Sequence, residues 1–160
     1  MDMRAWSPVY AGSEILEPPV RRVLVAMRDH ALRRIVASVL RRDGIDAIEA
    51  FDENQTLEEI RRVTPDRRIE AVLVDARREP DSVAETIARV RSADSRLAVI
   101  ALVVRRDDEF VATATSRGAV VLRLPMTSRD LRATLDAAAG TANFAPGLES
   151  VAQAAAVASA

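Results

Sequence analysis

The residue with the clearest chemical potential is Asp75, which ends the apolar run Val72-Leu73-Val74. In sheets of parallel strands, functional groups collect beyond the carboxyl ends of the strands, and this carboxylate would lie there. Such a carboxylate can accept a covalent group, bind a hard metal ion through oxygen, or pair with an arginine. The other residues of the chain narrow this choice.

Composition excludes several kinds of catalysis. All 23 basic residues are arginines, so the chain has no lysine for a Schiff base. It has no cysteine for a thiolate, a disulfide or zinc, and its one histidine, His30, cannot form a two-histidine metal site. No G-x-S-x-G turn, P-loop or G-x-G-x-x-G motif is present. We therefore expect no enzyme and no cofactor.

Charge and hydropathy also limit the partners. The formal net charge of −1 supplies no basic field for nucleic acid or an anionic membrane. The longest apolar runs, such as 97–104, are too short to span a bilayer, and the first residues lack the basic and apolar regions of a signal peptide. We expect a cytoplasmic protein that binds neither nucleic acid nor membrane.

Five short apolar runs predict β-strands. Continuous Val, Leu and Ile in the first, third and fourth runs indicate strands that are buried on both faces. The runs cover residues 22–27, 45–50, 69–75, 97–104 and 119–124.

The segments after the first two runs predict helices. The first has apolar residues at 32, 35, 36, 39 and 40, which predicts an inward stripe, and it ends at Gly44. The second follows Asp52, a suitable N-cap, and must end before Pro65.

Three further helices are predicted from their caps. Ser82 with Glu85 three residues later forms a capping-box pattern. Asp107 can cap a weaker helix, and Thr127 or Ser128 can cap the last one.

Strict alternation of strands and helices predicts a parallel sheet between two helical layers, a three-layer α/β/α sandwich. The length and the 49% hydrophobic content fit one domain, at residues 21–140. Residues 1–20 are predicted to be a flexible N-terminal arm, and 141–160 an Ala-rich C-terminal tail. Trp6 and Tyr10 in the arm could dock on the domain or a partner, or have no role.

Several stretches resemble the response-regulator receiver family, over about residues 21–139. The resemblance implies a flavodoxin-like or CheY-like five-stranded parallel sheet of order 2-1-3-4-5. In that family a histidine kinase donates a phosphoryl group to the aspartate that ends the third strand, here Asp75. The similar stretches are 23–26, 32–36, 72–75, 118–119 and 124–125.

The residues that the family places around this aspartate are absent. The acidic pair that helps to hold Mg²⁺ in the family corresponds to Met27 and Arg28. The phosphate-binding hydroxyl residue corresponds to Val103, the lysine to Leu124 and the switching aromatic residue to Val121. The resemblance therefore implies a degenerate pocket, a pseudo-receiver.

Asp75 then has two open roles: a carboxylate that pairs with an arginine or caps its own loop, or a residual phosphoacceptor. Arg28 is the predicted counter-ion, replacing the metal with a guanidinium. Asp29 suits the N-cap of the first helix. Under the alternative, Asp29 or Glu79 would serve as a ligand for Mg²⁺.

Arginines also gather near the predicted carboxyl edge of the sheet. They could bind an anionic ligand or an interaction partner, or they could be solvated side chains balanced by nearby acids. They are Arg28, Arg77, Arg78, Arg105, Arg106 and Arg123.

The interpretation we favour is a phosphorylation-independent protein–protein interaction module of bacterial two-component signal transduction. The resemblance places its docking or homodimer face on the fourth helix, fifth strand and fifth helix. Arg129, Arg132, Asp130 and Asp136 could form complementary pairs there. The alternatives are a regulator still phosphorylated on Asp75 with a rearranged metal site, and an anion-binding domain.

Overall fold

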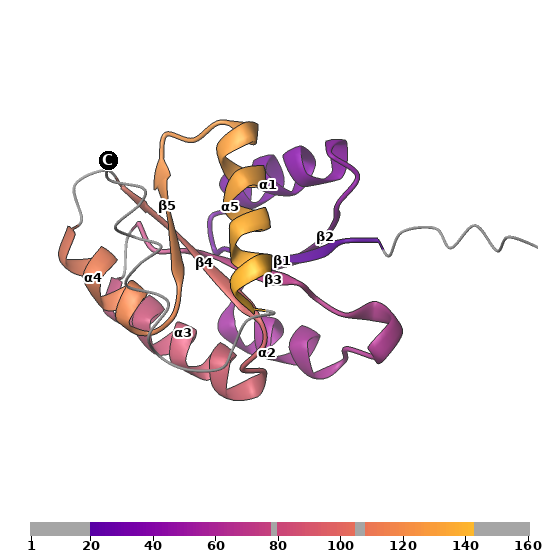
Figure 1. Cartoon of the computed structure of the whole chain (residues 1–160), viewed down its shortest axis with the longest axis horizontal. Coiled ribbons are helices and arrows are strands. Elements are labelled where there is room, and N and C mark those ends of the chain that lie inside the picture. The colour runs from indigo at the N-terminus through magenta and orange to yellow at the C-terminus, as the bar shows by residue number, and fades with distance from the viewer. Residues whose placement is uncertain (1–19, 78–79, 105–107, 143–160) are drawn as a thin grey trace, which may run out of the picture.

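A computed structural model describes residues 20–77, 80–104 and 108–142. Strands and helices alternate along the chain, and one short 3-10 turn precedes β3 (Figure 1). The elements are β1 (Arg22–Ala26), α1 (His30–Arg42), β2 (Asp46–Ala50), α2 (Glu53–Arg61), η1 (Pro65–Arg67), β3 (Ala71–Asp75), α3 (Pro80–Ala93), β4 (Ala98–Val104), α4 (Asp108–Ser116), β5 (Val120–Leu124) and α5 (Ser128–Ala142).

The five strands form one parallel sheet in the order β2-β1-β3-β4-β5, as predicted. The register pairs Ala26 with Val74, and Asp75 with Leu102, so the carboxyl ends of β1, β3 and β4 meet at one edge. The strand order reverses between β1 and β3. Asp75 therefore lies at the switch point where open α/β sheets bind ligands.

Two helical layers cover the sheet: α1 and α5 on one face, and α2, α3 and α4 on the other (Figure 1). Neighbouring residues of one strand supply opposite cores. Val23 and Val25 pack in the cluster with α1 and α5, while Leu24 packs in the cluster with α2, α3 and α4. This alternation follows from the two-residue period of a strand.

Several predicted helix ends are confirmed. The Asp29 carboxylate accepts a hydrogen bond from the Leu32 amide (3.0 Å), and the Asp52 carboxylate accepts one from the Gln55 amide (2.8 Å). Gly44 follows α1 with a positive φ of 76°, a conformation that favours glycine.

A capping box begins α5. The Thr127 hydroxyl accepts a hydrogen bond from the Asp130 amide (3.1 Å), and the Asp130 carboxylate accepts one from the Thr127 amide (2.7 Å). Of the two predicted caps, Thr127 is therefore the one used.

Two helix predictions are wrong. α3 already begins at Pro80, so Ser82 lies in its first turn and does not cap it. Proline is favoured there because its fixed φ suits a helix and its missing N–H has no helical partner to lose. Ile35, predicted to face inward, is 61% exposed. The predicted cap Asp107 lies outside the described residues.

α5 continues to Ala142, two residues past the predicted end of the domain. Val20 is the one described residue of the predicted arm, so Trp6 and Tyr10 lie outside the described residues. The predicted tail after Ala142 also lies outside them. Within the described ranges, every helix is too short or too polar to cross a membrane.

Candidate functional site

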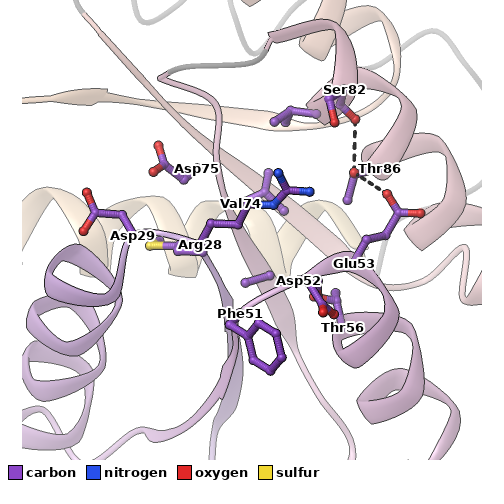
Figure 2. Close-up of a pocket in the computed structure, with 13 residues that line it drawn as sticks. Arg28, Asp29, Phe51, Asp52, Glu53, Thr56, Val74, Asp75, Ser82 and Thr86 are labelled. Atoms are coloured by element: carbon purple, nitrogen blue, oxygen red, sulfur yellow. Dashed lines mark hydrogen bonds between the residues drawn. The ribbon is translucent and has the colours of Figure 1, made fainter.

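A pocket of about 510 Å³ opens at the carboxyl edge of the sheet, beside the switch point between β1 and β3. Residues that follow β1 and β3 line one side, and the first turns of α2 and α3 line the other (Figure 2). Its lining is Ala26, Met27, Arg28, Asp29, Phe51, Asp52, Glu53, Thr56, Val74, Asp75, Ser82, Val83 and Thr86.

Both carboxylate oxygens of Asp75 are bonded to one guanidinium. Arg77 Nε donates to Asp75 Oδ1 (2.8 Å), and Arg77 Nη2 donates to Asp75 Oδ2 (2.8 Å). The Arg77 backbone amide adds a third bond to Oδ1 (3.1 Å). The Asp75 side chain is only 12% exposed, so this bidentate pair is largely shielded from water.

The same guanidinium also holds a second carboxylate. Arg77 Nη2 donates to Asp29 Oδ2 (2.9 Å), while Asp29 Oδ1 caps α1 through Leu32. The Leu32 amide and then the Arg77 side chain lower the pKa of Asp29 below its usual value. Hydrogen bonds to Asp75, opposed in part by burial, and then to Asp29 raise the pKa of Arg77. Arg77 therefore joins the loops that follow β1 and β3.

The prediction that Arg28 is the counter-ion of Asp75 is wrong. The guanidinium on Asp75 comes from Arg77, two residues further along the same loop. Arg28 is exposed, and its side chain extends into the pocket (Figure 2). Sequence reasoning assigned Arg77 to an anion-binding edge. The available signal was the Asp-Ala-Arg spacing of 75–77, which lets an arginine fold back on the aspartate.

The other positions compared with the receiver pocket are apolar. Met27 is 2% exposed and Val103 is fully buried, so both belong to the core. Val121 packs against the cluster with α2, α3 and α4, and Leu124 is half-buried at the end of β5. None of these four side chains supplies an oxygen ligand or a cation for a phosphoryl group.

With Arg77 bound to Asp75, the described residues at this edge do not fit a hard divalent cation. Mg²⁺ requires oxygen ligands, but one position beside Asp75 holds a buried thioether, Met27, and the next holds the cation Arg28. Arg77 already bonds to both Asp75 oxygens. Among the described residues, no three His, Cys, Asp or Glu side chains are grouped to hold a metal. Glu79, the other predicted ligand, lies outside those residues.

A second polar network, not predicted from the sequence, forms the far side of the pocket. The Thr86 hydroxyl bonds to Glu53 Oε2 (2.8 Å) and to the Ser82 carbonyl (3.1 Å) (Figure 2). Arg89 pairs with Glu53 and with Glu85. These contacts link α2 to α3 and neutralise Glu53.

The predicted arginine edge is only partly described. Arg77 is used by Asp29 and Asp75, and Arg123 pairs with Asp108 (3.0 Å). Arg78, Arg105 and Arg106 lie outside the described residues. Arg77 and Arg123 thus contact carboxylates of the same chain.

The acids of the predicted dimer face also have partners within the chain. Asp136 pairs with Arg21 (2.6 Å), and Asp130 caps α5. Arg129 and Arg132 are exposed on α5, and His30 is exposed at the start of α1. The complementary pairs predicted across that face would therefore compete with existing contacts.

No protein-family model matches the chain, and no curated protein sequence matches it. Solved structures do resemble it. A receiver domain from Clostridium thermocellum has a TM-score of 0.69 at 21% identity, covering 78% of this chain and 98% of that one.

Two others are similar. A receiver protein from Burkholderia phymatum has a TM-score of 0.63 at 26% identity, covering 75% of this chain and 95% of that one. The chemotaxis protein CheY4 of Vibrio cholerae has a TM-score of 0.65 at 20% identity, covering 74% and 98%. The chain thus has the fold of response-regulator receiver domains.

Proposed function

We propose that this chain is a pseudo-receiver: a module of bacterial signal transduction that acts by binding a partner protein, without phosphorylation and without turnover of its own. The observation that supports this most directly is the bidentate Arg77–Asp75 pair. A guanidinium on both oxygens blocks the carboxylate from attacking a phosphodonor and offsets the charge that a metal would otherwise offset.

The apolar positions around Asp75 support the same conclusion. By the receiver resemblance, the residues at positions 103 and 124 would bind a phosphoryl group on Asp75; here they are Val103, which offers no hydroxyl, and Leu124, which offers no ammonium group. Without those donors, its charge would be poorly stabilised and its presence would not be relayed to β5.

The alternative is a regulator that is still phosphorylated on Asp75, with a rearranged metal site. One observation favours it: Asp29 and Asp75 converge on a single cation, Arg77. If Arg77 moved aside, the two carboxylates could share a divalent ion instead.

One experiment separates the two functions. The full chain is incubated with Mg²⁺ and beryllofluoride, and in parallel with a small-molecule phosphodonor. Asp75 is followed by mass spectrometry and backbone amides by NMR, with Asp75→Asn as the control. We expect no adduct and no shift beyond those of the control. A stoichiometric adduct on Asp75 with shifts reaching β5 would establish the alternative.

A further inference from the structure

The pocket beside the switch point combines buried apolar side chains with one exposed aromatic ring. Met27 and Val74 are 2% and 3% exposed, and Val83 is half-buried in α3. Phe51, the residue after β2, also lines the pocket and is 56% exposed. The volume of about 510 Å³ falls in the range of roughly 300–1,000 Å³ that small-molecule sites occupy. The pocket therefore has the size and composition for a small ligand with an apolar body.

Four carboxylates line this pocket, and three of them have both oxygens bonded within the chain. Arg77 bonds to both oxygens of Asp75 and to one of Asp29, and the other oxygen of Asp29 caps α1. Glu53 bonds through one oxygen to a hydroxyl of α3 and through the other to a guanidinium of the same helix. These three carboxylates therefore have no free acceptor position for a ligand.

The fourth carboxylate, Asp52, has one oxygen that is not used in this way. Its Oδ1 accepts a hydrogen bond from the Gln55 amide (2.8 Å), and no described residue bonds to Oδ2. The side chain is half-buried in the lining of the pocket. Because an ionised carboxylate only accepts hydrogen bonds, a ligand that binds to Oδ2 must offer a donor.

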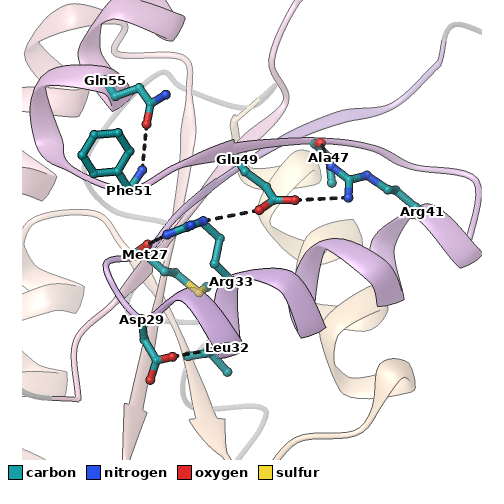
Figure 3. A network of polar contacts seen from close by, with 9 residues as sticks. All are labelled: Met27, Asp29, Leu32, Arg33, Arg41, Ala47, Glu49, Phe51 and Gln55. Carbon is teal, nitrogen blue, oxygen red and sulfur yellow. Dashed lines mark hydrogen bonds and ion pairs between the residues drawn. The ribbon is translucent and has the colours of Figure 1, made fainter.

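The walls that carry these groups are held in place by the chain itself. The Phe51 amide donates to Gln55 Oε1 (2.9 Å) (Figure 3), while the Gln55 amide donates to Asp52, so the turn before α2 is bonded in both directions. On the opposite wall, Arg33 Nη1 donates to the Met27 carbonyl (2.7 Å) (Figure 3). A site that is formed in advance costs little ordering when a ligand binds.

The charges around the pocket favour a neutral ligand over an anion. Arg28 is the one cation among the lining residues, which include four carboxylates. Arg77 and Arg89 pair with lining carboxylates, and with them the count is four carboxylates against three guanidiniums. A phosphate or carboxylate group on the ligand would add to this excess of negative charge.

We infer that this pocket binds a neutral purine-type ring, as a free base or a nucleoside, with an N–H donor beside a carbonyl acceptor on one edge. The N–H group donates to Asp52 Oδ2. The carbonyl accepts from Arg28, whose side chain extends into the pocket (Figure 2). The flat ring packs against Phe51, because bases stack on aromatic side chains. This goes beyond the proposed function, since a small ligand can bind whether or not a partner protein does.

The test is an NMR titration of the isotopically labelled full chain with three compounds. Inosine has the required edge, 1-methylinosine has a methyl group in place of the N–H donor, and inosine 5′-monophosphate adds negative charge. Inosine should bind and shift backbone amides of 27–29, 51–56 and 82–86. 1-Methylinosine should bind at least about tenfold more weakly, as for loss of a hydrogen bond to a charged group. The monophosphate should also bind more weakly than inosine.

Two positions are tested by substitution. Asp52→Asn keeps an oxygen for the cap of α2 but replaces the free acceptor with a donor, so inosine should bind at least about tenfold more weakly. Phe51→Ala removes the ring and should weaken binding by about tenfold, whereas Phe51→Tyr keeps the ring and should restore it. The matched control is Ile35→Ala, which removes an exposed apolar side chain of α1 outside the pocket and should leave affinity unchanged.

The amide spectrum of each variant shows whether it is folded. Absence of inosine binding, equal binding of inosine and 1-methylinosine, or shifts centred outside the pocket would overturn the inference. Tighter binding of the monophosphate would overturn it as well, since the site would then select an anion. None of these results bears on the proposed function, which depends on the Arg77–Asp75 pair and is tested by the phosphodonor experiment.

Discussion

At the scale of single residues, the Arg77 guanidinium bonds to the carboxylate for which the resemblance implies a metal ion. Arg77 bonds to two oxygens of Asp75 and one of Asp29, so three bonds converge on one guanidinium. Its planar fork matches a carboxylate edge in a way that a lysine would not. The charge balance at the edge of the sheet therefore depends on this residue.

Replacing Arg77 tests that dependence. In Arg77→Ala, Asp75 and Asp29 would face each other without a cation, one of them largely buried. We expect a loss of about 1–2 kcal/mol in the free energy of unfolding, more than a surface pair contributes and less than a fully buried one. Urea denaturation would measure it.

Arg28→Ala is the control, because Arg28 lines the pocket together with Asp75 while the guanidinium on Asp75 is that of Arg77. Its effect should be smaller than that of Arg77→Ala, because Arg77 supplies the bidentate pair with Asp75. Equal losses in the two variants would contradict the assignment of Arg77 as the counter-ion.

The lowered pKa of Asp29 makes a prediction about pH. A carboxylate with a lower pKa in the folded than in the unfolded state adds stability above its ordinary pKa, about 3.9. That stability is lost as the pH falls through the folded value. Asn can still cap α1, so Asp29→Asn keeps the cap but removes the charge and the acceptor for Arg77 Nη2. Urea midpoints of wild type and variant should differ at about pH 7 and converge below about pH 4.

The sequence predicted part of this residue-level arrangement. Asp29 as an N-cap could be predicted because a cap depends only on local spacing. The role of Arg77 could not, because its direction depends on the path of the loop after β3. Arg28 and Arg77 both follow a predicted strand, and the sequence does not distinguish them as partners for Asp75. Only the fold decides which one reaches that carboxylate.

At the scale of elements, the start of α5 offers a clean test of a cap. Thr127→Ala removes the acceptor for the Asp130 amide and should cost about 1 kcal/mol in unfolding free energy. Ser128→Ala, one residue further and inside the helix, should cost nearly nothing. A larger loss in the Ser128 variant would contradict the assigned cap.

The predicted strands agree with the structure more closely than the predicted helix starts and buried helix faces do. The strands were recognisable because continuous Val, Leu and Ile require burial on both faces. The prediction that Ser82 caps α3 was wrong because a capping-box pattern can also occur inside a first turn. Pro80 already begins α3. The prediction that Ile35 faces inward was wrong. Its spacing fits the apolar stripe, but the buried side of α1 is narrower than that stripe.

At the scale of the whole molecule, two cores lie on opposite faces of one sheet. Neither can melt alone, since neighbouring residues of each central strand belong to different cores, such as Val23 and Leu24. We expect one cooperative unfolding transition. Methyl NMR during urea titration should give coincident midpoints for Leu135, in one core, and Ile87, in the other. Midpoints separated beyond error would indicate two independently unfolding layers.

Layer architecture was predictable because strands and helices alternate, which leaves few ways to cover a parallel sheet. The order of the strands came from the family resemblance rather than from periodicity. Charge pairing across the fold, such as Arg21 with Asp136, was not predictable, because the two residues meet only after α5 packs on the sheet.

The occupancy of a metal site at the switch point would depend on the concentration of free metal ion, and a chelator would empty it. The Arg77 guanidinium is attached to the chain, so its local concentration is permanent, and it keeps its charge throughout the physiological pH range. The arrangement around Asp75 should therefore be the same in excess magnesium and in EDTA. If the proposed partner-binding function is right, the state of this site would not change with the magnesium level of the cell.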